Sequence, residues 1–276
     1  MKPSAFFTPR AAVLAPLALF AASVAGAATI PFTNDFSSVG LANNSGFTLG
    51  SGFQTLSVSN TVATVGYSNS QFTNAANTSF TLTSQFRITS LGTSTGGVSQ
   101  SVGFGFFGTE ATFAGGSTTP YLYANWSFNL GTLSIIEVDA TNTNVQSGTP
   151  TADLNGATAG FITPGSTLYT LKLAVTNTAP GTYSLSFGVF DSAGTTQFGS
   201  SATVASYSIA SLTTTTDLDA NGFYGIRSRI PLISGTTTVG FDNFAITSSA
   251  IPEPSTYAAL AGLGVLGLAA SRRRRA

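Results

Sequence analysis

Three oxygen-bearing side chains at alternating positions make the stretch DLDANG, residues 217–222, the first candidate for chemistry. Asp217, Asp219 and Asn221 fit the first half of a calcium loop, in which alternate oxygens surround a hard cation and a glycine permits the tight turn. An EF-hand is excluded, because Ser228 stands where its bidentate glutamate would be and the flanks predict strands. Two interpretations stay open: a Ca²⁺ loop between strands, and an ordinary turn, since Asp and Asn before Gly are frequent in turns.

A pair of carboxylates is the second candidate. In IIEVDATN, Glu137 and Asp139 lie two positions apart on a predicted strand, so both project from one face. The pattern resembles the Glu-x-Asp-x-(x)-Glu strand of the jelly-roll endoglucanases, which implies Glu137 as nucleophile and Asp139 as helper. The acid position falls on Thr141 or Asn142, and neither can protonate a leaving group. We therefore predict a non-enzymatic protein.

An aromatic row is the third candidate. Tyr121, Tyr123 and Asn125 share one face of a predicted strand whose opposite face is apolar and belongs to the core. If exposed, this row would be a ligand-binding platform, because pyranose rings stack on tyrosine rings. The alternative is that these aromatic side chains pair with neighbouring strands across the sheet.

Composition excludes several classes of chemistry. The 276 residues include no cysteine and no histidine, so disulfides, Cys/His metal sites and Ser-His-Asp or Cys-His catalysis are absent. Between residues 28 and 250, four basic residues face nine acidic ones, which gives this body a net charge of −5. An acidic body without a basic stripe predicts no nucleic-acid partner.

The body of the chain, residues 28–250, is predicted to be an all-β domain. Apolar and polar residues alternate in SFTLTSQFRI, SVGFGFF, YLYANWSF, YTLKLAV, YSLSFGV and VGFDNFAI, and Gly/Asn/Ser/Thr clusters separate these runs. No long helical period occurs between them. The spacing predicts a two-sheet antiparallel jelly-roll sandwich of about twelve strands.

The order of features resembles the concanavalin A-like, or laminin-G-like, jelly rolls of secreted bacterial proteins. The body opens with PFTNDFSS and closes with GFYGIRSR and VGFDNFAI. The resemblance implies carbohydrate binding, glycan cleavage or adhesion, and the fold alone does not decide among them. Because the first and last strands of such folds lie together, Asp35 and Asp242 form a second candidate pair for Ca²⁺.

The first 27 residues predict a signal peptide. Lys2 and Arg10 form a basic n-region, an apolar run follows to about Val24, and Ala25-Gly26-Ala27 fits the A-x-A cleavage rule. We expect signal peptidase to remove this segment before Ala28.

The C-terminal segment, residues 251–276, predicts a membrane anchor. An uncharged apolar stretch, residues 257–270, is short for a spanning helix, but prolines separate it from the body and arginines follow it. Arginines favour the cytoplasmic side and can snorkel along a short helix. The segment therefore predicts a transmembrane helix at the inner membrane, with the body outside.

These parts resemble the PEP-CTERM sorting signal of exopolysaccharide-producing Gram-negative bacteria. The recognition motif is Pro252-Glu253-Pro254, and the retention cluster comprises Arg272, Arg273, Arg274 and Arg275. The resemblance implies processing by exosortase near the recognition motif and delivery to the cell surface or extracellular matrix. We thus expect an exported, non-enzymatic matrix or adhesion module that binds a polysaccharide. A structural surface-coat component without a ligand is a further interpretation. The alternative is a glycoside hydrolase or lyase whose acid comes from a loop, such as Glu110 or Asp153.

Removal of the signal peptide and processing by exosortase would together leave a mature chain with two defined ends. Mass spectrometry of the exported protein should find Ala28 at the N-terminus and a C-terminus close to Pro252-Glu253-Pro254. Recovery of the intact chain from the cell exterior, with Arg272 to Arg275 still attached, would contradict this sorting route.

Overall fold

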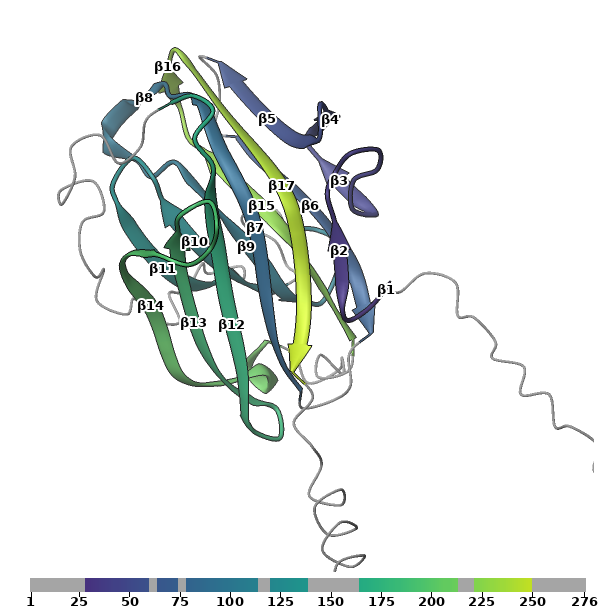
Figure 1. The fold of residues 1–276 in the computed structure, drawn as a ribbon. Coiled ribbons are helices and arrows are strands. Elements are labelled where there is room, and N and C mark those ends of the chain that lie inside the picture. Colours follow the sequence, from purple (N-terminus) through teal and green to yellow (C-terminus); the bar gives the residue numbers. More distant parts are fainter. Residues whose placement is uncertain are drawn as a thin grey trace, which may run out of the picture.

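The computed structural model describes residues 28–59, 64–73, 78–113, 120–138, 164–212 and 221–249, which form two stacked β-sheets (Figure 1). In the described residues, the seven-stranded sheet has the order β1–β6–β15–β9–β10–β11, and β3 also pairs with β6. Its strands are β1 (Ala28–Thr29), β3 (Asn43–Ser45), β6 (Thr64–Thr73), β9 (Ser101–Gly108), β10 (Tyr121–Ser127), β11 (Thr132–Val138) and β15 (Asn221–Ile230).

The eight-stranded sheet of the described residues has the order β14–β13–β12–β7–β17–β5–β4, and β2 also pairs with β17. Its strands are β2 (Phe32–Asn34), β4 (Thr48–Gly50), β5 (Phe53–Ser59), β7 (Ser79–Ser90), β12 (Tyr169–Ala179), β13 (Thr182–Phe190), β14 (Gln197–Ser208) and β17 (Thr236–Ser249). Short elements connect the sheets: β8 (Thr93–Ser94), β16 (Ile233–Ser234), and the 3₁₀ turns η1 (Thr95–Gly97) and η2 (Ile209–Ser211).

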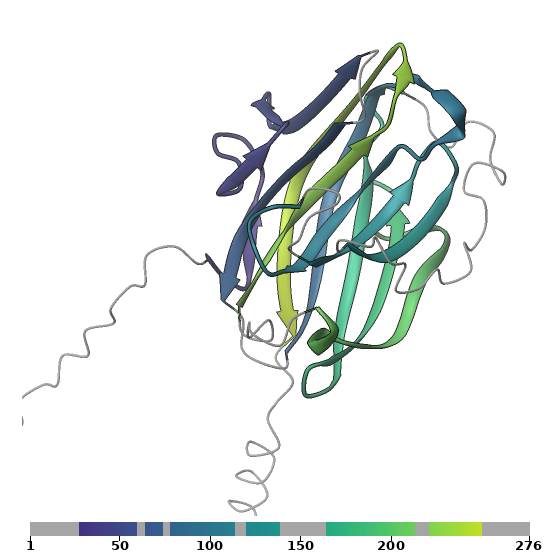
Figure 2. The ribbon, with the colours of Figure 1, turned by 180° about the vertical axis from the view of Figure 1, so that it is seen from behind.

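The predicted all-β, two-sheet antiparallel sandwich is confirmed. Figure 1 looks onto the eight-stranded sheet, and Figure 2 shows the other sheet from behind. Within the described strands, one short pair departs from the prediction, because β1 runs parallel to β6.

An aromatic core joins the two sheets. Phe86 of β7 meets Trp126 of β10 edge to face, with ring centroids 5.4 Å apart, and Phe104 of β9 meets Phe187 of β13 at 6.2 Å. Edge-to-face pairs add favourable quadrupole contacts to the burial of large apolar rings. Buried phenylalanines therefore supply much of the core that the high aromatic content predicts.

Strand β7 behaves as its alternating sequence predicts. Phe80, Leu82 and Phe86 are buried in the core, while Thr81 and Thr83 on the other face are half-buried. Strands β9 and β10 differ, because every residue of both is buried. These two strands are therefore covered on both faces, and their alternation does not mark a solvent-exposed side.

The two predicted processing segments lie outside the described residues. They are the signal peptide, residues 1–27, and the sorting segment with its transmembrane helix, residues 251–276. Within the part of the chain that the structure does describe, no helix has the length and hydropathy needed to cross a membrane.

A glycine at the middle of β15 provides a test of the sheet packing. A Cβ atom added at Gly225 would lie 2.1 Å from the backbone oxygen of Ser68 and 2.6 Å from Asn69 Cα. Because backbone atoms would have to move, Gly225→Ala should reduce the free energy of unfolding by about 1–3 kcal/mol, measured by urea denaturation. Gly50→Ala is the matched control, since a Cβ there meets nothing within 4 Å. Equal stability of the two variants would contradict the tight packing at Gly225.

Candidate functional site

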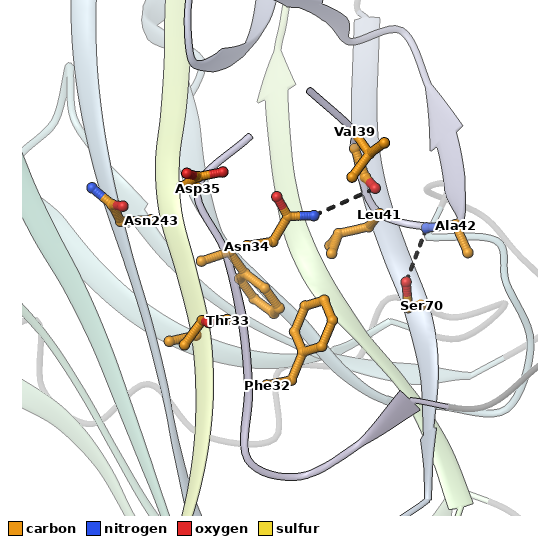
Figure 3. A pocket seen from close by; sticks show the side chains of 12 residues that line it. Phe32, Thr33, Asn34, Asp35, Val39, Leu41, Ala42, Ser70 and Asn243 are labelled. Carbon is orange, nitrogen blue, oxygen red and sulfur yellow. Dashed lines mark hydrogen bonds between the residues drawn. The ribbon is translucent and has the colours of Figure 1, made fainter. Parts of the chain in front are cut away.

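A pocket of about 810 Å³ lies beside β2 and is the larger of the two depressions considered below. It is lined by β2 and the adjoining Asp35, by residues 39–42, by Ser70 of β6 and by Asn243, Phe244 and Ala245 of β17 (Figure 3). We call it the β2 pocket. Residues from both ends of the body meet here because β2 pairs with β17, with Asn34 opposite Phe244.

Side-chain hydrogen bonds hold the loop that follows β2. Asn34 Oδ1 accepts a bond from the backbone N–H of Phe36 at 2.8 Å, and Asn34 Nδ2 donates to the Gly40 carbonyl at 3.4 Å. The Ala42 N–H donates to Ser70 Oγ at 2.9 Å, as Figure 3 shows. Asparagine commonly forms such local bonds in turns, and here they fix the wall of the pocket.

The pocket has an apolar part made by Phe32 and Val39. The half-buried Phe32 ring packs edge to face on Phe72 at 5.0 Å and on Phe244 at 6.4 Å, which anchors it to the core. Val39 is 64% exposed. Both side chains line the pocket and supply apolar surface to it.

The rim of the pocket is acidic. Asp35 is exposed, and the Ser37 N–H, 3.0 Å from Asp35 Oδ1, lowers the pKa of this carboxyl. Asp242, next to the rim residue Asn243, has a raised pKa, first because of its partial burial and also because of the negative charge of Asp35. Its Oδ1 accepts the Asn243 N–H at 2.7 Å, and Asn243 adopts a left-handed backbone with φ of 50°.

The structure brings Asp35 and Asp242 close enough to interact, as the fold resemblance implies. The described residues contain no group of three or more His, Cys, Asp or Glu side chains that could hold a metal ion. Of the predicted calcium loop, Asp217 and Asp219 lie outside the described residues. Asn221 begins β15 and accepts a hydrogen bond from Thr73 Oγ1 at 3.2 Å. Calcium binding by this loop therefore stays a prediction.

The tyrosine row on β10 is not exposed. Tyr121, Tyr123 and Asn125 are 0%, 2% and 6% exposed, respectively. The Phe113 ring stacks on Tyr121 at 4.8 Å, and the Arg227 guanidinium lies 4.1 Å from the centre of the Tyr123 ring. These contacts correct the interpretation as an open platform and favour the alternative, in which the aromatic side chains pack within the domain.

Arg227 fixes this covered face. Its Nε donates to the Phe113 carbonyl at 2.8 Å, and the Tyr121 hydroxyl donates to the same oxygen at 3.0 Å. Burial raises the pKa of Tyr121 to about 12 and also raises that of Tyr123. Both hydroxyls therefore stay protonated at neutral pH, and this cluster is structural.

The carboxylates considered for catalysis do not come together in the described residues. Glu137 lies opposite Leu122, so it shares the side of the sheet that faces the core, and it accepts a hydrogen bond from Tyr207 at 2.9 Å. This bond links β11 to β14 of the other sheet. Glu110 is exposed in a loop, and Asp139 and Asp153 lie outside the described residues.

Two aspartates with opposite pKa shifts give a pH test, in which Asp242 reports on the rim and Asp191, in the loop after β13, is the comparison. The pKa of Asp242 is raised, so its contribution to stability is full below the ordinary value of 3.8 and is lost as the pH rises through the folded-state pKa. Asp242→Asn should therefore melt at the same or a higher temperature than the wild type at pH 7 in low salt. The pKa of Asp191 is lowered by the Thr195 N–H, so Asp191→Asn should melt at a lower temperature at pH 7.

Thermal unfolding between pH 3 and pH 7 measures both effects. The difference between Asp242→Asn and the wild type should shrink towards pH 3, where this carboxyl becomes protonated. The contribution of Asp191 is full above the ordinary value of 3.8 and is lost only as the pH falls through its lower folded-state pKa, so its difference should persist to lower pH. A clear loss of stability in Asp242→Asn at pH 7 would show that this carboxylate has a favourable partner instead of a repulsive one.

Comparison with known proteins identifies the two parts of the chain. Residues 250–275 match the PEP-CTERM protein-sorting motif, and no curated protein sequence matches the chain. Among solved structures, the metal-free lectin I-B4 of Griffonia simplicifolia is 11% identical, with a TM-score of 0.50, and the match covers 80% of this chain and 99% of the lectin. Lectin II of Ulex europaeus is 10% identical (TM-score 0.48, 80% and 98% covered). The Bauhinia forficata lectin in complex with GalNAc is 13% identical (TM-score 0.48, 79% and 98% covered).

These similarities concern the fold of the body and the sorting of the chain. The lectin-type sandwich, which the concanavalin A-like resemblance implies, is confirmed as the fold of the body. The sorting motif implies export, a C-terminal anchor and processing by exosortase. The chain is thus a lectin-like β-sandwich that carries a PEP-CTERM protein-sorting motif at residues 250–275.

Proposed function

We propose that the exported body binds a saccharide in the β2 pocket and does not cleave it. The observation that supports this function best is the composition of the pocket, in which an apolar surface and polar oxygen and amide groups meet. Phe32 and Val39 supply the apolar part, and Asp35 and Asn243 supply the polar rim. Binding pockets combine apolar walls with a few well-placed polar groups in this way.

The chemistry of a sugar matches both parts. A pyranose ring has faces of C–H groups, which pack on aromatic and aliphatic side chains, and an equator of hydroxyl groups. A carboxylate accepts hydrogen bonds from two adjacent hydroxyls, and an asparagine amide both donates and accepts. Asp35 is ionised at neutral pH, as an exposed aspartate is, and is therefore a strong acceptor.

The sorting motif supports a role for this binding outside the cytoplasm. A module held at the envelope would attach the cell surface to a surrounding polysaccharide, and one released to the exterior would act in the matrix. We therefore propose a role in cell-surface or matrix adhesion. No specific contact among the described residues favours a glycosidase or lyase, so release of reducing ends is the outcome that would replace this proposal. If reducing ends are released, loss of that release in Glu137→Gln would assign the activity to the strand carboxylate Glu137.

Replacement of Asp35 tests the proposed pocket. Saccharides identified on a glycan array should bind Asp35→Ala at least about tenfold more weakly than the wild type in titration calorimetry, because hydrogen bonds to a charged acceptor are lost. The protein used for these measurements should be the exported, processed form. Glu110→Ala is the matched control, since Glu110 is an exposed loop acid away from the pocket lining and should leave the Kd unchanged.

Two results would overturn the proposal. One is the absence of any bound saccharide on the array. The other is a saccharide whose affinity is the same for the wild type, Asp35→Ala and Val39→Asp, because Val39→Asp places a charge where the apolar face of the sugar would pack.

A further inference from the structure

A second depression adjoins the β2 pocket at Asn243. It has a volume of about 330 Å³ and lies over the outer side of the eight-stranded sheet, between β7, β12 and residues 192–194. Asn243 lines both depressions. Each volume falls in the range of ligand pockets, so the two together form a site longer than one sugar residue requires.

The boundary between the two depressions is rigid. Asn243 Nδ2 donates to Gln85 Oε1 at 2.8 Å, and Gln85 Nε2 donates to the Ser192 carbonyl at 2.8 Å. Thr170 Oγ1 donates to the same carbonyl at 3.2 Å. A chain of bonds thus ties β17, β7 and the loop after β13 together beneath any ligand that crosses from one depression to the other.

The second depression contains a basic side chain, Lys172 of β12. Its Nζ donates to the Gly194 carbonyl at 3.3 Å and lies 4.9 Å from the centre of the Phe190 ring. Within the described parts of the chain, this ammonium forms no ion pair with a carboxylate. The nearby loop acid Asp191 instead accepts the Thr195 N–H at 2.8 Å and the Thr195 hydroxyl at 3.1 Å.

An ammonium group has three N–H donors, and one carbonyl satisfies only one of them. The ring and the carbonyl hold Lys172 in position, so two donors are available to an incoming anion with little loss of side-chain entropy. The linings of the two depressions therefore differ in charge: that of the β2 pocket includes one carboxylate, Asp35, and that of its neighbour includes one cation, Lys172.

From this polarity we infer that the ligand is an acidic polysaccharide whose anionic sugar residue lies in the second depression against Lys172, next to a neutral residue in the β2 pocket. The inference rests on the proposed saccharide binding and extends it to the class of saccharide. Asp35 would repel an anionic residue in the β2 pocket, whereas Lys172 attracts one beside it. The charge pattern therefore sets the direction in which the polysaccharide lies across the two depressions, as well as the class of polysaccharide.

The experiment measures the affinity of the exported, processed protein for three matched ligands. They are hyaluronan octasaccharide, in which uronate and neutral residues alternate, its carboxyl-reduced form, and a sulfated dextran oligomer of similar length. Hyaluronan should bind at least about tenfold more tightly than its reduced form in low salt, and this difference should diminish at 0.5 M salt. Tight binding of the dextran sulfate alone would assign the anion as a sulfate instead of a carboxylate, with the same role for Lys172.

Lys172→Met removes the charge and keeps a side chain that can cover Phe190. It should abolish the preference for the acidic ligand while the carboxyl-reduced ligand keeps its wild-type Kd. Arg229→Met, which removes an exposed cation from the other sheet, is the control and should change neither value. An unchanged preference in Lys172→Met would overturn the inference. If instead no ligand binds in an Asp35-dependent manner, the proposed function itself fails.

Discussion

Strand β17 must pair on one side with a single long strand, β7, and on the other side with two separate short strands, β5 and β2. Between Asp242 and Ala245 it advances three residues, while β7 advances two, from Gln85 to Thr83. This extra residue is a β-bulge, and Asn243 adopts the left-handed conformation that asparagine tolerates better than most residues. The bulge sits between the start of β5, where Gln54 pairs with Phe241, and the end of β2, where Asn34 pairs with Phe244. The pocket and its acidic rim therefore depend on it.

The bulge also keeps the core intact. Val239 and Phe241 face the core at a spacing of two, and without an extra residue the next core position would be 243. Because the bulge shifts the alternation by one, Phe244 and Ile246 point inward, while the polar pair Asp242 and Asn243 remains at the surface. The same local irregularity therefore serves packing and creates the polar surface of the site.

The sequence predicts those parts of the fold that depend on a simple alternation. Strand β7 is an example, because its outward residues are polar and its inward residues, apart from the buried Ser84, are apolar. It does not predict the cover over β9 and β10, because their alternation is the same whether the second face meets water or protein. At Gly105 the missing side chain leaves room for the Phe113 ring, whose atoms would lie 2.3 Å from an added Cβ. That contact joins residues from a loop and a strand, and no local pattern reveals it.

The candidate site was only partly predictable for a related reason. Adjacency of the first and last strands correctly brings Asp35 towards Asp242, yet β2 has three residues, too few for a periodicity that would identify the inward Phe32. In VGFDNFAI, the change in apolar spacing from two to three residues is the one local signal of the bulge. Lys172 also looks like an ordinary surface residue of β12 in the sequence. Its position beside Asn243 arises only when β12 and β17 pair with opposite sides of β7.

The placement of the two sheet ends bears on how sorting and binding coexist in one chain. Strand β1 begins at Ala28, directly after the expected signal-peptide cleavage point, and β17 ends at Ser249, just before Pro252-Glu253-Pro254. Removal of either processing segment therefore breaks no hydrogen bond of the described sheets.

The N-terminal β2 and the C-terminal β17 nevertheless form the pocket together, so the site requires both ends of the body to be in place. A truncation that went a few residues further into β17 at the C-terminal side would remove pairs with β7 first and would reach β2 next, since Ile246 pairs with Phe32. Trimming at the motif leaves β17 whole, so this processing step is compatible with the proposed binding.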